Sequence, residues 1–334
     1  MRIGVPKETK EGERRVGLAP AHVASLTRDG HEVVLEPLAG RATGFDDDAY
    51  RAAGARIGDA WDAPLIVKVK EMQDADFLRL RAGQALFSFQ QLPGAPDRTR
   101  RLAASGATAI AFEMVSEAGG GYPLLAPMSI IAGRLAIEVG ARHLQRTPKR
   151  VLVLGAGHAG QAAAQAARKI GASVDILRRG TATPEEVERL ARQADLVVGA
   201  VLVAGAPTPK LLPRSLVARM KRGAVIIDVS IDGGGVAETS RPTTHAAPTF
   251  VEEGVIHYCV ANMPAAAPRE ATLALADAVL PYAGELASKG IARAVRENPA
   301  LRAGVLVWKG RVNHRGIAQE AGLPYTALSD ADLS

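Results

Sequence analysis

The feature that most constrains the fold is a run of β-forming residues that leads straight into a glycine-rich loop. Residues 151–154 read Val-Leu-Val-Leu, residues 155–160 read Gly-Ala-Gly-His-Ala-Gly, and residues 161–170 have a helical pattern. A GxGxxG loop between a strand and a helix is typical of a dinucleotide site, because its glycines permit the tight turn, the approach of a diphosphate and close helix–strand packing. The alternative is a glycine-rich turn that binds no ligand.

The remaining chain alternates short apolar runs with helical stretches. Alternation of this kind predicts parallel strands covered by helices on both faces. We therefore expect an α/β protein with a Rossmann-type doubly wound sheet and a second α/β domain. Strands are expected at residues 2–6, 32–35, 64–70, 85–89, 108–112, 151–154, 172–177, 196–203 and 224–229, and helices at 21–30, 129–144, 161–170 and 269–286. The segment after the last helix has little sheet signal.

The length of 334 residues suits two domains. We expect an NAD(P)-binding domain at residues 128–267, which includes the glycine loop. Residues 1–127 would form the substrate and catalytic domain, completed by residues 268–334.

Composition excludes several other kinds of protein. The single cysteine, Cys259, can form neither an internal disulfide nor a cysteine-based metal site, and we expect no bound metal. The N-terminus lacks the apolar core of a signal peptide, and no apolar run approaches the roughly 20 residues that span a bilayer. We therefore expect a cytoplasmic protein without membrane partners.

The net charge of +6 leaves nucleic acid as a conceivable partner. However, the basic residues are spread along the chain and aromatic residues make up only 4% of it, so stacking platforms would be scarce. We expect no nucleic-acid binding. The excess of positive charge could instead attract small anionic molecules.

The residues after the second strand of the nucleotide unit bear on the choice of cofactor. An NAD site usually has Asp or Glu about 20 residues after the glycine loop, where the carboxylate binds the ribose hydroxyls. This chain has Arg178 and Arg179 there. Guanidinium groups can bind a 2′-phosphate, so the sequence favours NADP(H) and leaves NAD(H) possible.

Several segments, taken together, resemble the alanine dehydrogenase family, with the first domain of transhydrogenase as a more distant relative. The resemblance covers nearly the whole chain. Its motifs are GVPKE (residues 4–8), ERRV (13–16), VKVKE (67–71), LAPMS (125–129), AVLV (200–203), Ile231 with Asp232, SRPTT (240–244) and VANMP (260–264).

The resemblance implies reversible reductive amination, in which pyruvate, ammonia and a reduced nicotinamide give L-alanine. By motif match, Arg15 would bind the substrate carboxylate, Lys70 would bind and polarise the carbonyl or imine, and Asp232 would assist catalysis beside the nicotinamide. The family also implies a homo-oligomer, either a hexamer or a dimer. The resemblance implies that Ser129, His158, Ala159, Val201, Leu202, Arg241 and Asn262 line the cofactor. With the glycine loop and the two arginines discussed above, the full set of predicted cofactor-binding residues is Ser129, Gly155, Gly157, His158, Ala159, Gly160, Arg178, Arg179, Val201, Leu202, Asp232, Arg241, Val260, Asn262 and Met263.

The chain departs from the family at several positions. Gln91 stands where the family has its catalytic histidine, and glutamine donates a hydrogen bond but cannot shuttle a proton near neutral pH. Arg178 replaces the ribose-binding acid, and Met72 replaces a proline. The loop before residue 151 and the stretch between residues 179 and 195 are short.

Three functions stay open at this point. The first is an NAD(P)-dependent amino-acid dehydrogenase that acts on pyruvate or a related 2-oxo acid. The second is an NADPH-dependent imine or keto-acid reductase, similar to carboxyethylornithine synthase, which would fit the loss of the histidine. The third is a non-catalytic NADP(H)-binding protein, which would have no need of Arg15, Lys70 and Asp232 together.

Overall fold

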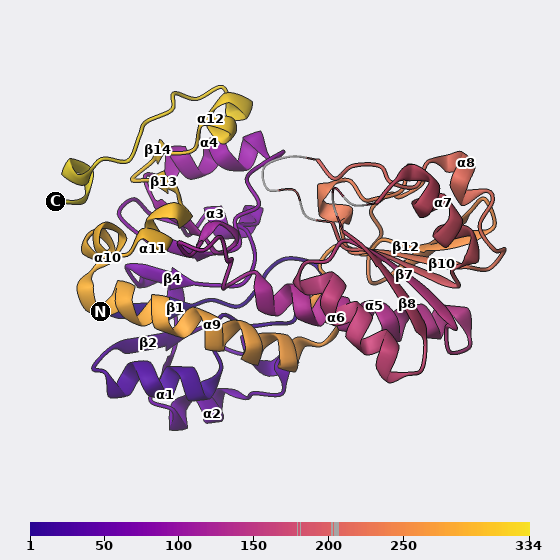
Figure 1. Cartoon of the computed structure of the whole chain (residues 1–334). Helices are drawn as coiled ribbons and strands as arrows, with labels where there is room; N and C mark the ends of the chain where they lie inside the picture. The colour runs from indigo at the N-terminus through magenta and orange to yellow at the C-terminus, as the bar shows by residue number, and fades with distance from the viewer. Residues whose placement is uncertain (179, 181, 202, 204–206) are drawn as a thin grey trace. The chain divides into compact units, whose positions relative to one another are not determined.

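The computed structural model describes residues 1–178, 180, 182–201, 203 and 207–334. Contacts divide the chain into two compact units (Figure 1). The first unit contains Met1–Pro127 and Ala267–Ser334, and the second contains Met128–Ala266. Two predicted cofactor residues, Arg179 and Leu202, lie outside the described residues.

The first unit is built on one mixed sheet with helices packed against it. The six strands β1 to β6 are parallel to one another, and β13 pairs antiparallel with β6. In spatial order they are β14 (Arg311–Val312), β13 (Val305–Trp308), β6 (Thr108–Ala111), β5 (Ala85–Ser88), β4 (Leu65–Val67), β1 (Arg2–Val5), β2 (Glu32–Leu35) and β3 (Arg56–Ile57). The helices are α1 (Pro20–Arg28), α2 (Asp47–Ala52), α3 (Asp74–Phe77), α4 (Pro96–Ser105), α9 (Pro268–Lys289), α10 (Ile291–Glu297), α11 (Pro299–Gly304) and α12 (Arg315–Ala321).

The second unit contains the glycine loop and a second sheet, parallel except for β11 at one edge. Its strand order is β11 (Thr249–Glu252), β12 (Val255–Tyr258), β10 (Val225–Asp228), β9 (Leu196–Gly199), β7 (Arg150–Leu154) and β8 (Ser173–Leu177). Its helices are α5 (Ala126–Leu144), α6 (His158–Lys169), α7 (Pro184–Gln193) and α8 (Arg214–Val217). From β7 the chain winds outward to β8 and then returns to β9 on the other side, which is the doubly wound arrangement predicted from the sequence.

The central strands are buried along their whole length and are mostly apolar. All residues of β4, β5, β6, β9 and β10 are buried. The edge strand β8 has no fully buried residue. This difference is expected for parallel sheets, whose inner strands read as continuous hydrophobic runs.

Glycines fix the turn from β7 into α6. Gly155 has a φ of +109°, a conformation that favours glycine. A Cβ atom on Gly160 would lie 1.9 Å from the carbonyl oxygen of Gly155, so the first turn of the helix packs directly against the turn backbone. The helix begins at His158, three residues before the predicted start.

Two sequence predictions of secondary structure were wrong. The segment after α9 was expected to lack sheet, but it contributes β13, a short and fully buried strand that pairs with β6. The strand expected at residues 196–203 ends at Gly199, while β11 and β12 were not predicted. β13 directly follows a helical region, and β11 and β12 contain the polar residues Thr249, Glu252 and His257, so these strands do not stand out as apolar runs.

Among the described residues, no helix combines the length and apolarity that a membrane crossing requires.

Candidate functional site

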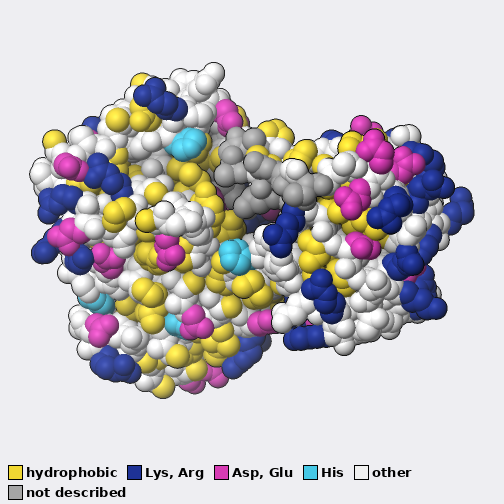
Figure 2. All heavy atoms as spheres, in the orientation of Figure 1, with side chains coloured by type: hydrophobic (Ala, Val, Ile, Leu, Met, Phe, Trp, Pro, Cys, Tyr) yellow, Lys and Arg dark blue, Asp and Glu magenta, His cyan; other side chains and the backbone are white. Residues whose placement is uncertain are grey.

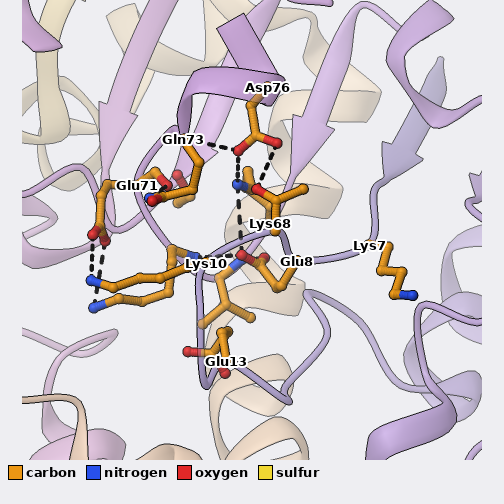
Figure 3. A network of polar contacts seen from close by, with 12 residues as sticks. Lys7, Glu8, Lys10, Glu13, Lys68, Glu71, Gln73 and Asp76 are labelled. Carbon is orange, nitrogen blue, oxygen red and sulfur yellow. Dashed lines mark hydrogen bonds and ion pairs between the residues drawn. The ribbon is translucent and has the colours of Figure 1, made fainter. Parts of the chain in front are cut away.

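A buried polar network in the first unit ties the N-terminal segment to the end of β4 (Figure 3). Glu8 accepts hydrogen bonds from the backbone N–H of Val69, at 2.6 Å, and of Lys70, at 3.3 Å. β1 and β4 are parallel neighbours, so the segments after their carboxyl ends meet at one edge of the sheet. The Glu8 carboxylate thereby fixes the backbone that carries Lys70.

Lys68 provides positive charge to this network. Its side chain is fully buried, and its Nζ lies 2.6 Å from Oδ2 of Asp76 and 3.6 Å from Oε2 of Glu8. Burial lowers the pKa of Lys68, but Glu8 and Asp76 raise it more, so its pKa is above the usual value. Burial also raises the pKa of Glu8, and Lys68 only partly offsets this. Lys68 is therefore charged and holds two buried carboxyl groups.

Arg15, the predicted carboxylate-binding residue, is held in one orientation by Glu13. Its Nε and Nη2 atoms donate to the two carboxylate oxygens of Glu13 at 2.8 and 2.6 Å. Glu13 also accepts the backbone N–H groups of Arg14 and Arg15. Both side chains of the pair are buried. A two-bond contact of this kind fixes the plane of the guanidinium group.

Lys70, the predicted carbonyl-polarising residue, is buried next to Glu71. Its Nζ lies 3.5 Å from Oε2 of Glu71, and Lys10 donates to Oε1 of the same carboxylate at 2.5 Å. Burial raises the pKa of Glu71, but Lys70 and Lys10 lower it more, so the pKa of Glu71 lies below its usual value. The first unit therefore keeps two lysines beside one ionised carboxylate (Figure 3).

Gln91, at the family's histidine position, lies in a tightly held turn after β5. Its φ is +46°, and its backbone N–H donates to Glu113 at 2.7 Å while its carbonyl accepts from Arg98 at 2.8 Å. Glu113 also accepts the N–H of Gln90, and burial raises its pKa. Sequence reasoning missed Glu113. Its place just after β6, beside the end of β5, was the available signal.

The glycine loop of the second unit lines a surface hollow. The wall includes Ile130, Ala156, Gly157, His158 and Gln161. Among the described residues, no atom lies within 4 Å of a Cβ atom placed on Gly157, so their packing does not demand a glycine there. A glycine at this position leaves the backbone open to a close ligand, and the amino end of the 12-residue helix α6 attracts an anion. The loop therefore fits the diphosphate of a dinucleotide.

Other predicted cofactor residues follow the carboxyl ends of neighbouring parallel strands. Gly155 follows β7, Val201 lies just after β9, Asp232 after β10, and Val260 after β12. Parallel strands end at one edge, so the sheet brings these positions together. Asp232 is exposed in a short turn, residues Ile231–Gly233.

The remaining predicted residues also lie in the second unit. The Arg241 guanidinium stacks on the ring of Phe250, 4.1 Å from its centroid. Asn262 has a φ of +68°. Ser129 lies in the first turns of α5, and Arg178 directly follows β8. Ala159 and Gly160 belong to the first turn of α6, and Val260 and Met263 are buried.

Charged side chains of both signs are distributed over the surface (Figure 2). On the face shown in Figure 2, Lys and Arg side chains are interspersed with Asp and Glu over both units. Many exposed arginines pair with carboxylates, as Arg214 does with Glu252 and Glu253. Among the described residues, no group of His, Cys, Asp and Glu could hold a metal ion.

Comparison with known proteins identifies the family. Residues 4–132 match the N-terminal domain of the Alanine dehydrogenase/PNT family, and residues 139–190 and 180–315 match its C-terminal domain. The chain belongs to the Alanine dehydrogenase/PNT family. The resemblance read from the sequence is thereby confirmed, and the family places the chain among nicotinamide-dependent oxidoreductases.

Similar proteins in this family cover nearly the whole chain. The alanine dehydrogenase of Mycobacterium tuberculosis is 45% identical over 98% of this chain and 98% of its own length. That of Halomonas elongata is 42% identical over 97% of this chain and 98% of its own length.

Solved structures agree with the fold. A structure of L-alanine dehydrogenase matches with a TM-score of 0.90 and 40% identity, covering 96% of this chain and 99% of that one. The transhydrogenase of Sinorhizobium meliloti matches with a TM-score of 0.83 at 23% identity, covering 94% of this chain and 99% of that one, which supports the fold alone.

The Lys68 network of this family member can be tested through stability. Lys68→Met should lower the free energy of unfolding by about 3–5 kcal/mol, because it leaves Glu8 and Asp76 buried without their cation. The measurement is urea unfolding at neutral pH. Arg2→Met is the control, since the Arg2–Glu32 pair is exposed and its loss should change stability far less than the loss of Lys68. Equal losses in the two variants would contradict the central role of Lys68.

Proposed function

We propose that this chain catalyses the reversible reductive amination of pyruvate to L-alanine with NAD(H). The observation that carries the proposal is the pairing, in one chain of this family, of a glycine loop suited to a diphosphate with buried, pre-oriented Arg15 and Lys70. Alanine dehydrogenases at 42% and 45% identity over nearly the full length support the substrate.

Arg15 would bind the carboxylate of the oxo acid. A guanidinium group can form two parallel hydrogen bonds with a carboxylate, which sets the orientation of a small substrate. The contact with Glu13 keeps the plane of Arg15 fixed before the substrate arrives, so little side-chain entropy is lost on binding.

Lys70 would donate to the carbonyl oxygen of pyruvate and stabilise negative charge that develops there during attack by ammonia. A charged donor in a site with little water is more effective than the same donor in solution. Glu71, between Lys70 and Lys10, would keep Lys70 in place.

The second unit would bind the dinucleotide, with its diphosphate at the amino end of α6 and its nicotinamide near Asp232. The nicotinamide supplies the hydride, which is the step that side chains cannot perform. Asp232 would accept or return the proton of the carbinolamine, because glutamine at position 91 cannot do so. Gln91 would contribute only a hydrogen bond to the substrate.

Gln91 also supports a second candidate function, the reduction of a preformed imine. If an imine forms in solution between an oxo acid and a larger amine, its reduction requires no histidine to assist carbinolamine breakdown. The chain would then be an imine reductase that acts on a larger amine. Position 91 is the specific observation that favours it.

An assay of NADH oxidation distinguishes the two candidates. With pyruvate, we expect turnover with ammonium to exceed turnover with larger primary amines. Arg15→Lys should raise the KM for pyruvate about tenfold to a hundredfold, because a hydrogen bond to a charged group contributes about 1.5–3 kcal/mol. The exposed Arg2→Lys variant is the control. Turnover that depends on a larger amine would favour the imine reductase, and NADH binding without any turnover would leave a non-catalytic protein.

The identity of the cofactor is a separate prediction. Similarity to the alanine dehydrogenases favours NAD(H), against the NADP(H) preference that Arg178 and Arg179 suggested from the sequence. We expect a higher kcat/KM with NADH than with NADPH, and Arg178→Ala should change the NADH value by less than about threefold. Preference for NADPH that is lost in Arg178→Ala would instead identify Arg178 as a ligand of the 2′-phosphate.

We also propose a homo-oligomer, hexamer or dimer, on the basis of the family alone. Sedimentation velocity of the purified chain would test it, and a monomer at micromolar concentration would contradict it.

A further inference from the structure

The buried carboxylate at the end of β10 has an unusual set of partners. Asp228 has no exposed surface, and it accepts hydrogen bonds from the backbone N–H of Ser230 at 3.2 Å, the N–H of Val236 at 2.8 Å and the hydroxyl of Ser240 at 2.6 Å. Within the described part of the chain, no ion pair with Lys or Arg accompanies these contacts. All three donors come from the segment that follows β10.

The surrounding backbone is shaped to admit this carboxylate. A Cβ atom on Gly199 would lie 2.9 Å from Oδ1 of Asp228, and one on Gly235 would lie 2.5 Å from Oδ2. Gly235 also has a φ of +80°. Two glycines are therefore needed for the carboxylate to fit between the ends of β9 and β10 and the returning loop.

Ser230 connects Asp228 to the backbone near two predicted cofactor residues, Val201 and Asp232. Its carbonyl accepts the N–H groups of Gly233 and Gly235, each at 3.0 Å, which closes the turn that presents Asp232. Its hydroxyl accepts the N–H of Val201 at 2.8 Å. One residue held by Asp228 thus connects the segment after β9 with the segment after β10.

The far end of the loop is fastened in the same way. Ser240, which donates to Asp228, directly precedes Arg241. Lys210 supports the middle of the loop by donating to the carbonyl oxygens of Gly235 and Ala237 at 3.0 and 3.1 Å. The segment from Ser230 to Ser240 is therefore anchored at both ends on one carboxylate.

A buried carboxylate without a cation is a costly way to hold a loop. We infer that Asp228 is a positioning residue for the nicotinamide cofactor, because it fixes together the segments that carry Val201, Asp232 and Arg241. This inference rests on the proposed function for the roles of those three residues. Asp228 itself would not touch the cofactor, since it has no exposed surface.

Burial raises the pKa of Asp228 above its usual value, and the hydrogen bonds from Ser240, Val236 and Ser230 lower it in part. The same surroundings affect the single cysteine. Cys259 is fully buried, and burial together with the nearby Asp228 raises the pKa of its thiol to about 12. Its protection from thiol reagents therefore reports on whether this part of the unit stays closed.

A second buried aspartate, at the amino ends of the strands of the same sheet, provides a matched control. Asp195 is also a buried aspartate, and it directly precedes β9. It accepts from Lys221, from Arg146 and from the backbone N–H of Lys149 and Arg150. These partners lie before strands or, in the case of Arg150, at the first residue of β7, so they are at the amino ends of the strands and away from the predicted cofactor site. Loss of Asp195 should therefore affect stability without affecting the cofactor.

The experiment compares Asp228→Asn with Asp195→Asn. Asparagine keeps the shape of aspartate but replaces one acceptor oxygen with an NH2 group, which faces either the N–H of Ser230 or the donors of Val236 and Ser240, so at least one donor loses its acceptor. The readouts are NADH binding by fluorescence titration, kcat, the KM for pyruvate, and the reactivity of Cys259 with a thiol reagent, all at a temperature at which both variants are folded.

We expect Asp228→Asn to weaken NADH binding about tenfold or more and to lower kcat, with little change in the KM for pyruvate. The KM for pyruvate should hold because Arg15 and Lys70 belong to the other unit. Cys259 should react faster. Asp195→Asn should leave NADH binding and kcat within about twofold of the wild type, even if it unfolds at lower urea.

Equal effects of the two variants on NADH binding, or an unchanged Asp228→Asn enzyme, would overturn the inference. If Asp228→Asn does not fold, Ser230→Ala takes its place, since it removes only the link to Val201. It should weaken NADH binding while leaving the KM for pyruvate unchanged, and unaltered NADH binding would count against the inference. Wild-type protein that binds NADH but does not aminate pyruvate would contradict only the proposed function. The comparison of NADH binding between the variants would still test the role of Asp228.

Discussion

The close contact between Gly160 and the carbonyl of Gly155 determines the geometry of the nucleotide unit. With 1.9 Å left for a Cβ atom, only glycine lets the first turn of α6 lie against the end of β7. This contact places the amino end of α6 at the point where the chain reverses its winding across the sheet, between β7 and β9. Ligands of doubly wound folds bind at such a point. The cofactor site therefore follows from a packing constraint on the backbone.

Buried charges organise the ends of the strands in both units, and they do so in two ways. In the first unit, Lys68 compensates Glu8 and Asp76, so the N-terminal segment is fastened to the backbone of Lys70 by an ion-paired network. In the second unit, Asp228 relies on neutral backbone and hydroxyl donors. Backbone donors occupy fixed positions, so their hydrogen bonds to Asp228 hold the segment from Ser230 to Ser240 in one conformation. Glu113 serves the turn of Gln91 in a similar way, through the N–H groups of Gln90 and Gln91.

Much of this could be predicted from the sequence, and the exceptions have physical causes. The fold class follows from uninterrupted apolar runs such as residues 151–154, which lead directly into a glycine loop and are typical of buried parallel strands. β13 was missed because four apolar residues at the end of a helical region do not define a period. Arg15, Lys70 and Asp232 came from motifs, but Asp228 and Glu113 did not, because a buried carboxylate is recognised only by the donors that surround it. The sequence indicates a nicotinamide cofactor, but the residues after β8 do not by themselves decide between NAD(H) and NADP(H), since an arginine indicates a 2′-phosphate only if it faces one.

The most direct test of the account is NADH binding by Gly157→Ala, with Gly160→Ala as its counterpart. In the part of the chain that the structure describes, no atom would contact a methyl group at position 157. That variant should therefore unfold at nearly the same urea concentration as the wild type and yet bind NADH much more weakly. Gly160→Ala should instead lose about 1–3 kcal/mol of stability, because the added methyl group meets the backbone. Unchanged NADH affinity in Gly157→Ala, or a wild-type protein that binds no nicotinamide dinucleotide, would contradict the assignment of the glycine loop.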